Sequence, residues 1–225
     1  MQVAAPHVDR LTESRRQAEK TYDRLSRWYD ILADASEKRA RNLGLDMLVV
    51  ESGEDALEIG VGTGHAAVAL ARSAGPDAMV VGMDAAWRML QRARARVSKS
   101  ALSGRVSLIR AEAARLPFRD GRFDVVFMSF VLEIFDTAGI SVVLSECHRV
   151  LRPGGRICIV SLSVTPSPGP VERAYAWAHR RLPAWIDCRP IRVQESLDRA
   201  GFVTLDAVRV STWGLPIAVV VVRKP

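Results

Sequence analysis

The segment ALEIGVGTG, residues 56–64, constrains the fold of this chain more than any other. It begins as a short apolar run typical of a buried strand, and an alanine-rich, helix-like stretch over 63–73 follows it. Glycines at such a junction let the backbone adopt positive φ and approach a ligand closely. The helix that follows offers free N–H groups and the positive end of its dipole. The segment therefore predicts a strand, a ligand-binding loop and a helix in succession.

Strand-like and helix-like segments alternate from this point to residue 162. We expect the last helix of the series to end at Pro153-Gly154-Gly155, because this triplet disfavours a helix. Alternation of this kind favours a parallel sheet with right-handed crossovers, so the predicted fold is α/β, Rossmann-like, with helices on both faces. The expected strands are 55–60, 78–83, 106–109, 123–128 and 156–162, and the expected helices are 63–73, 86–99 and 140–151.

Three other regions complete the expected organisation. Residues 1–50 are polar with a helical apolar stripe and predict an N-terminal helical lid, ahead of a main domain over 51–225. Residues 164–190 open with TPSPGP and continue as a Trp- and Arg-rich helix, which we interpret as an inserted flap. Beyond a helix at 191–200, strands at 202–210 and 217–222 predict a hairpin that ends in an antiparallel C-terminal strand.

Composition excludes several classes of protein. The chain has 225 residues, 48% hydrophobic and 25% charged, which is typical of a globular domain and not of a disordered or fibrous chain. The apolar stretch 215–222 is far shorter than the roughly 20 residues that span a bilayer, and residues 1–10 do not resemble a signal peptide. Three cysteines without CxxC spacing predict neither a disulfide framework nor a metal site. We therefore expect a cytoplasmic protein without a metal.

The positive charge is concentrated in the last third of the chain. The net charge is +7, and residues 149–225 hold 12 basic and 5 acidic residues, so the excess (12 − 5 = 7) lies there. This excess of positive charge is compatible with binding of an anionic substrate, an anionic membrane surface or nucleic acid. It is equally compatible with a basic surface that only contacts solvent.

The loop spacing separates two classes of ligand. Asp84 ends the second strand about 20 residues after the loop, where a carboxylate can accept hydrogen bonds from ribose hydroxyls. A dinucleotide fingerprint, GxGxxG, needs a third glycine at position 65, which is His65. The loop instead is GxGxG and lies two residues after Glu58. A nearby acid disfavours a pyrophosphate but suits a cationic sulfonium and an ammonium, so S-adenosylmethionine is favoured over NAD.

Five segments in order carry a family resemblance. They are ALEIGVGTG, VVGMDAAWRMLQRAR, AEAARLPF with DGRFD, FMSFVLEIF and LRPGGRICIV, over about residues 55–162. With them, the sequence resembles the class I S-adenosylmethionine-dependent methyltransferases. Within that class it resembles the type 11 group, which includes ubiquinone/menaquinone-biosynthesis C-methyltransferases and small-molecule or lipid N-methyltransferases. The resemblance implies a mostly parallel sheet of seven strands.

The resemblance also implies roles for particular residues. The loop residues would line the methionine half of S-adenosylmethionine, and Asp84 would bind its ribose, with the residues on either side next to the adenine. YDRLSRWYD resembles the segment that covers the cofactor in this group, so Tyr22 and Tyr29 would close the pocket. The implied cofactor-binding residues are Tyr22, Glu58, Gly60, Gly62, Gly64, Met83, Asp84, Ala85, Glu112, Ala113, Ser129 and Phe130.

Two positions depart from the family pattern. Glu112 stands where the family usually has Asp, and Glu133 stands where the quinone enzymes commonly have Arg. An acid at 133 suits a cationic acceptor or a general base, so Glu133 and Tyr29 are the candidate catalytic residues. His148 is a weaker candidate, because packing of its helix on the sheet explains it better than a catalytic role does.

These observations predict methyl transfer from S-adenosylmethionine to a small, largely apolar acceptor, quinone-like or lipid-like, by in-line displacement. A nucleic-acid or protein methyltransferase is the first alternative, although no Asn/Asp-Pro-Pro-aromatic motif or Pro-Cys nucleophile is present. A non-enzymatic cofactor-binding regulator is the second, because fold alone does not fix function. An NAD-dependent oxidoreductase is the third. We expect a small-molecule or lipid-like partner, no nucleic acid, and room for peripheral membrane contact; the oligomeric state is left open.

Overall fold

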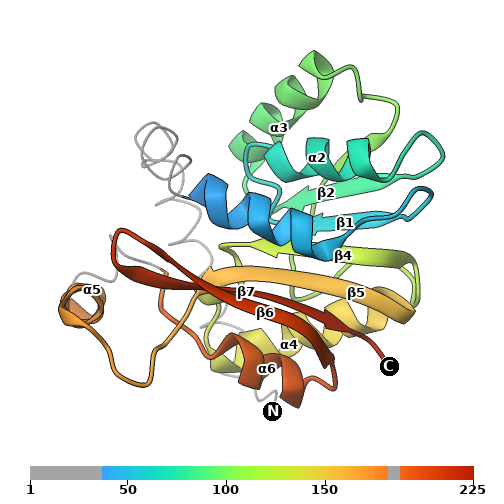
Figure 1. Cartoon of the computed structure of the whole chain (residues 1–225). Coiled ribbons are helices and arrows are strands. Elements are labelled where there is room, and N and C mark those ends of the chain that lie inside the picture. The colour runs from blue at the N-terminus through green and yellow to red at the C-terminus, as the bar shows by residue number, and fades with distance from the viewer. Residues whose placement is uncertain (1–36, 182–187) are drawn as a thin grey trace, which may run out of the picture.

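A computed structural model describes residues 37–181 and 188–225 of the chain. Within these ranges seven strands form one sheet in the order β3-β2-β1-β4-β5-β7-β6 (Figure 1). All neighbours from β3 to β5 are parallel, while β7 runs antiparallel to both β5 and β6. The predicted α/β fold with an antiparallel C-terminal strand is thereby confirmed. The strands are β1 (Ala56–Ile59), β2 (Val80–Asp84), β3 (Val106–Arg110), β4 (Phe123–Ser129), β5 (Leu151–Leu162), β6 (Val203–Thr212) and β7 (Leu215–Arg223).

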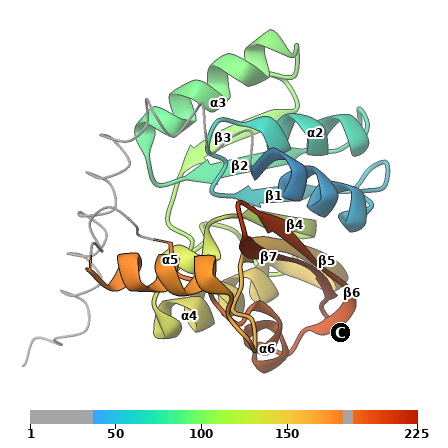
Figure 2. The same cartoon turned by 60° about the vertical axis from the view of Figure 1, so that its left-hand side comes forward.

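Helices cover both faces of the sheet (Figures 1 and 2). On one face a helix over residues 37–48 packs with α2 and α3 around the inward side chains of the strands. On the other face α4 and α6 enclose a second apolar cluster. The helices are α2 (His65–Ser73), α3 (Trp87–Lys99), α4 (Thr137–Val150), α5 (Pro170–Arg181) and α6 (Val193–Arg199), with a 3-10 turn η1 (Leu132–Ile134).

The central strands are apolar because both of their faces are covered. All four residues of β1 are buried, as are Val125, Val126, Phe127 and Met128 of β4. Parallel strands between two helical layers have no solvated face, which explains why they appear in the sequence as continuous apolar runs rather than alternating ones. Because β1, β2 and β4 run parallel, their carboxyl ends lie side by side at one edge of the sheet.

The helix over 37–48 belongs to this packed core. A Cβ on Gly44 would lie 2.6 Å from Val160 Cγ2 and 3.1 Å from Cys158 Sγ, so the helix backbone approaches β5 directly. Ala40 and Leu48 of the same helix are buried. The described part of the predicted 1–50 lid therefore packs against the sheet, while Tyr22 and Tyr29 lie outside the described residues.

The predicted start of the fifth strand, residue 156, is wrong, whereas the helix before it ends within one residue of its predicted end. The helix ends at Val150, and Leu151 is already extended and paired with Phe123. The Pro-Gly-Gly triplet belongs to β5, where Gly154 N–H donates to Lys224 O and Gly155 O accepts from Lys224 N–H. A Cβ on Gly155 would lie 2.9 Å from Asp124 O, so this glycine allows close strand contact rather than ending a helix.

The C-terminal region follows the predicted pattern. The hairpin of β6 and β7 turns through Trp213 and Gly214, and α5 lies in the predicted flap. The three cysteines, all within the described residues, are buried and free. Within the described ranges no helix has the length and apolar character needed to cross a membrane.

Candidate functional site

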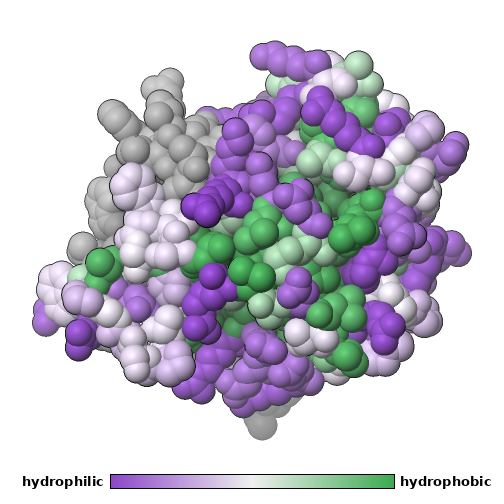
Figure 3. All heavy atoms as spheres, viewed as in Figure 1, coloured by the Kyte–Doolittle hydropathy of each residue, from purple (hydrophilic) through white to green (hydrophobic). Residues whose placement is uncertain are grey.

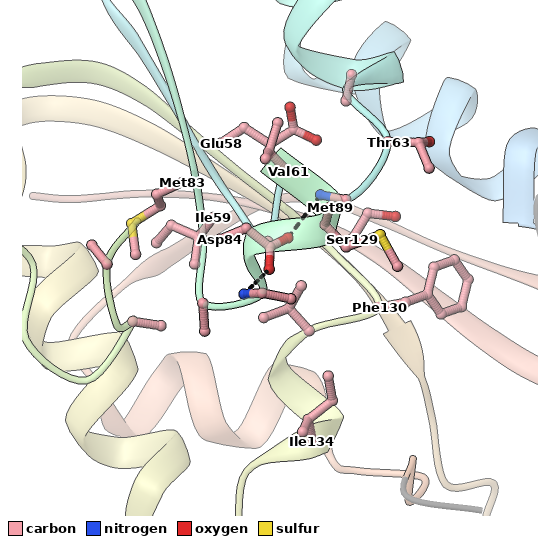
Figure 4. Close-up of a pocket in the computed structure, with 18 of the residues that line it drawn as sticks. Glu58, Ile59, Val61, Thr63, Met83, Asp84, Met89, Ser129, Phe130 and Ile134 are labelled. Atoms are coloured by element: carbon pink, nitrogen blue, oxygen red, sulfur yellow. Dashed lines mark hydrogen bonds between the residues drawn. The ribbon is translucent and has the colours of Figure 1, made fainter. Parts of the chain in front are cut away.

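A pocket of about 290 Å³ lies at the carboxyl ends of β1, β2 and β4 (Figure 4). In open α/β sheets this edge is where ligands bind. Its walls come from the glycine loop, the ends of β2 and β4, the segment after β3, η1 and the helix over 37–48. The lining includes ten of the predicted cofactor-binding residues, namely Glu58, Gly60, Gly62, Met83, Asp84, Ala85, Glu112, Ala113, Ser129 and Phe130.

The glycine loop is held tightly between β2, α3 and η1. Gly60, Gly62 and Gly64 all have positive φ, at +74°, +50° and +81°. A Cβ on Gly60 would lie 2.2 Å from Val131 Cγ2, and one on Gly64 would lie 2.9 Å from Ala93 Cα. Gly64 thus lies behind the pocket wall, where it lets α2 approach α3. Side chains at Gly60 and Gly64 would not fit, and the positive φ of Gly62 disfavours a side chain there.

Glu58 is a buried carboxylate at the base of the pocket. Its residue is 4% exposed, and among the described residues its Oε2 has no hydrogen-bond partner. Burial raises the pKa of Glu58 well above its ordinary value, although the positive charge of Arg41 and the N–H of Ala67 oppose the shift. A buried polar atom of this kind calls for an explanation. A cationic ligand group would supply both the missing partner and the compensating charge.

Asp84 connects the glycine loop to the end of β2. Its Oδ2 accepts the N–H of Gly62 and its Oδ1 accepts the N–H of Ala86, each over 2.9 Å (dashed in Figure 4). Burial raises the pKa of Asp84, and these backbone hydrogen bonds oppose the shift. A carboxylate has about four acceptor positions, so Asp84 retains capacity for ligand hydroxyls.

The segment after β3 forms the wall that contains Glu112 and Ala113. It is fixed from behind by α4, because Leu116 N–H donates to Glu146 Oε2 over 2.7 Å. Arg149 binds the same segment through the carbonyls of Leu116 and Phe118 and pairs with Glu146. The Arg149 guanidinium also lowers the pKa of Glu146, so the acceptor stays ionised.

The opposite wall comes from the end of β4. Phe130 has a φ of +56°, which a bulky side chain rarely adopts, and its N–H donates to Val160 O over 2.8 Å. Figure 4 shows Ser129 and Phe130 on this side of the pocket, with Ile134 of η1 below them. With Val131 and Phe135 they give this wall an apolar surface.

Glu133 does not belong to the lining of this pocket. It is fully buried, and its Oε1 accepts the N–H of Leu162 over 3.2 Å. Its catalytic role stays a prediction, and its surroundings are those of a residue that connects η1 to the end of β5. His148 contacts the Phe202 ring on the far side of the sheet, with ring centroids 5.1 Å apart.

Arg41 and His65 also line the pocket, and of these two sequence reasoning missed only Arg41. Arg41 reaches the pocket from the helix over 37–48, and no pattern in that polar segment indicates it. His65 lines the pocket, and its Nδ1 lies 3.2 Å from Arg96 Nη1. Because arginine only donates, His65 Nδ1 accepts and the proton of the neutral ring is on Nε2. The missing third glycine of a dinucleotide loop was the sequence signal that pointed to position 65.

Comparison with known proteins agrees with this geometry. Residues 56–155 match the family described as a methyltransferase domain. The fold, the glycine loop, Glu58 within β1 and Asp84 at the end of β2 agree with this match. Residues 56–155 thus carry the methyltransferase domain, and the chain shares the fold of a solved S-adenosylmethionine-dependent methyltransferase from Aquifex aeolicus, with a TM-score of 0.65 at 20% identity, covering 88% of this chain and 96% of that one.

Its curated relatives include quinone methyltransferases. It is 32% identical over 146 residues to the ubiquinone/menaquinone biosynthesis C-methyltransferase of Dinoroseobacter shibae, covering 65% of this chain and 57% of the relative. It is 29% identical over 164 residues to the demethylmenaquinone methyltransferase of Listeria monocytogenes, covering 71% and 68%. The match to the corresponding Lactobacillus johnsonii protein spans 49% of that relative. The chain thus spans about half to two thirds of these relatives.

Solved structures share the fold at low identity. The 1,6-didemethyltoxoflavin-N1-methyltransferase of Burkholderia thailandensis, with S-adenosylhomocysteine bound, has a TM-score of 0.69 at 18% identity, covering 100% of this chain and 92% of that one. The [4+2]-cyclase SpnF has a TM-score of 0.68 at 22% identity, covering 83% and 80%. Because one of these neighbours is described as a cyclase, the fold alone does not establish the reaction.

Proposed function

We propose that this chain transfers the methyl group of S-adenosylmethionine to a small, largely apolar acceptor that is quinone-like or lipid-like. The observation that carries the proposal is the pairing, in one pocket, of the buried Glu58 carboxylate with a glycine loop and Asp84. A cationic methionine group would match Glu58 and the glycine loop, and a ribose would match Asp84. The names of the curated relatives support the quinone-like class of acceptor.

The pocket residues fit S-adenosylmethionine. Glu58 Oε2, which has no partner among the described residues, would accept from the ammonium of the methionine part. Asp84 would hold the ribose hydroxyls with the acceptor capacity that Gly62 and Ala86 leave. Glu112 and Ala113 would contact the adenine, and Ser129 and Phe130 would lie beside the sulfonium.

The reaction needs positioning more than it needs a protein nucleophile. When bound, S-adenosylmethionine supplies an activated methyl group that an acceptor displaces in line. The tasks left to the chain are to orient the acceptor and to exclude water. Val131, Ile134 and Phe135 provide apolar surface for the second task and for an apolar acceptor. Tyr29, outside the described residues, remains a proposed lid and base candidate.

The test uses S-adenosylmethionine with an isotopically labelled methyl group. The purified full chain is incubated with it and a host extract, which is then divided into lipid, small-molecule, RNA and protein fractions. We expect label in the lipid or small-molecule fraction, and its loss with Asp84→Ala but not with Asp77→Ala at an exposed position. Label in RNA or protein would overturn the acceptor class. Binding of S-adenosylmethionine without label in any fraction would favour a binding protein.

A further inference from the structure

A second surface, remote from the pocket residues, lies at the same edge of the sheet. The β6–β7 hairpin extends past the last pair of β5, Leu162 with Ile217, and turns through Trp213 and Gly214. α5 packs beside this turn, because a Cβ on Gly214 would lie 3.2 Å from Val171 Cγ2. Figure 1 shows α5 and the hairpin end at the same side of the molecule. We define the α5–hairpin surface as Val171, Arg173, Trp177, Arg181 and Trp213.

The turn of the hairpin places a tryptophan in an unfavourable backbone conformation. Trp213 has a φ of +56° and Gly214 a φ of +78°, as in a two-residue type I′ turn. The first position of such a turn favours Asn, Asp or Gly, and a bulky residue there is strained. The side chain gains little from the fold in return, because Trp213 is 77% exposed. Strain at an exposed aromatic residue points to a function outside the folding of this chain.

The outer face of α5 combines a second tryptophan with arginines. Trp177 is 57% exposed, and Arg173 and Arg181, also exposed, lie four residues before and after it. Residues four apart lie on the same side of a helix, so the three form one exposed row. Tyr175 points the other way, into the protein, where its hydroxyl donates to Cys188 O over 2.8 Å. Figure 2 shows α5 along the outside of the molecule.

Basic residues outnumber acidic ones around this surface. Residues 164–181, 188–192 and 207–216 contain six arginines and one acid, Glu172. That carboxylate accepts from Thr165 Oγ1 over 2.6 Å and from Gly169 N–H over 2.8 Å, so it is engaged inside the flap. Figure 3 shows pale and purple atoms over α5 and the hairpin end. The surface therefore presents indoles and guanidinium groups together.

We propose that the α5–hairpin surface docks on a lipid surface with anionic headgroups. Tryptophan prefers the boundary between headgroups and acyl chains, and arginine beside it binds anionic headgroups. The indole of Trp213 stands at a protruding tip, which suits insertion into a lipid surface better than stacking in a nucleic-acid groove. The docking stands apart from the proposed methyl transfer; if the acceptor is lipid-like, docking also brings the pocket edge toward the layer that holds it.

Vesicle binding by the full chain tests the proposal. Phosphatidylcholine vesicles with and without phosphatidylglycerol are sedimented with the protein at low and high salt. We expect binding to the anionic vesicles that falls with salt. Arg173→Gln combined with Arg181→Gln should weaken it by about 25-fold, at roughly fivefold for each charge. Trp213→Asn should weaken it by about tenfold through loss of the indole, while keeping the turn, which Asn accepts.

Helix α3 supplies a matched control. It also carries an exposed tryptophan, Trp87 at 51%, together with the exposed Arg94. Trp87→Ala combined with Arg94→Gln should leave vesicle binding unchanged. Absence of wild-type binding, an equal loss in the α3 variant, or binding to single-stranded RNA in place of vesicles would each overturn the proposal. Vesicle binding requires no turnover, so its failure is distinguishable from failure of the proposed methyl transfer.

Discussion

Glu133 Oε1 accepts a hydrogen bond from the backbone N–H of Leu162 over 3.2 Å, inside the protein. The contact joins η1, which follows β4, to the last residue of β5. Both segments lead into the pocket edge, since Val131 and Ile134 line the pocket and the flap begins just after Leu162. The Glu133 carboxylate therefore holds the apolar wall of the pocket next to the start of the flap.

Replacing Glu133 separates this connecting role from a catalytic one. We expect Glu133→Ala to lower the free energy of unfolding by about 1–3 kcal/mol, because the N–H of Leu162 loses its acceptor. Glu133→Gln keeps an acceptor oxygen and should retain most of that stability. Urea unfolding and calorimetric titration with S-adenosylmethionine provide the readouts. A fall in turnover with Glu133→Gln, at unchanged stability and cofactor affinity, would restore the predicted catalytic role.

Asp84→Ala should weaken cofactor binding by about 10- to 100-fold, or roughly 1–3 kcal/mol. The substitution removes the proposed ribose acceptor and also the acceptor of the Gly62 and Ala86 N–H groups. Calorimetric titration measures the change, with Asp77→Ala as the exposed control. Wild-type affinity in Asp84→Ala would show that the ribose lies elsewhere.

Glu58 should make stability depend on pH in an unusual direction. Its folded-state pKa lies well above the ordinary 4.5, so between these values the folded state holds a proton that the unfolded chain releases. Stability contributed by this residue therefore falls as pH rises from about 4.5 through the raised pKa. Glu58→Gln should remove that slope and make the cofactor-free protein more stable at pH 8.

The same substitution should weaken cofactor binding and reduce its pH dependence. In the wild type an ammonium ligand favours the ionised carboxylate, so affinity should rise as pH increases from about 4.5 through the raised pKa of Glu58. Thermal unfolding and calorimetric titration across this range check both effects, with Glu51→Gln at an exposed position as the control. Identical pH slopes in Glu58→Gln and the wild type would contradict the assignment.

Gly64→Ala should destabilise the protein more than Gly53→Ala. Both glycines have positive φ, so each substitution incurs a backbone cost of about 1 kcal/mol. A Cβ at Gly53 meets nothing within 4 Å, whereas one at Gly64 would lie 2.9 Å from Ala93 Cα. We expect an additional cost of about 1–3 kcal/mol for Gly64→Ala, from the displaced α3. Urea unfolding of the two variants gives this difference directly, and equal losses would refute it.

The sequence predicted what depends on local pattern. Apolar runs, glycines and Asp84 placed β1, β2 and the loop correctly. A buried strand requires a run of apolar residues, and a positive φ favours glycine, so both can be recognised in the sequence itself. Leu151–Gly155 was misread because Pro and Gly suggest a turn, while the pairing that keeps the segment extended comes from Phe123 and Lys224, both distant in sequence.

The contacts that side chains make through tertiary packing could not be predicted as well from the sequence. Glu133 follows Leu132 in a motif that suggests a pocket acid, yet the 3-10 turn directs its carboxylate to Leu162. Arg41 reaches the pocket because Gly44 lets its helix lie close to β5, a contact no local pattern encodes. Ser129 and Phe130, at the end of β4, do line the pocket, and the apolar run that ends there made this position accessible from sequence.

The antiparallel strand β7 lies between β5 and β6, and this order has a consequence during synthesis. A chain emerging from the ribosome completes β5 and β6 before β7 exists, so the apolar edge of β5 has no strand to pair with until residues 215–223 emerge. Unpaired apolar edges recruit other chains. At about 5–20 residues per second the exposure is brief, but a translational pause just before Leu215 would prolong it. We therefore expect slow codons just before this stretch to lower the yield of folded protein.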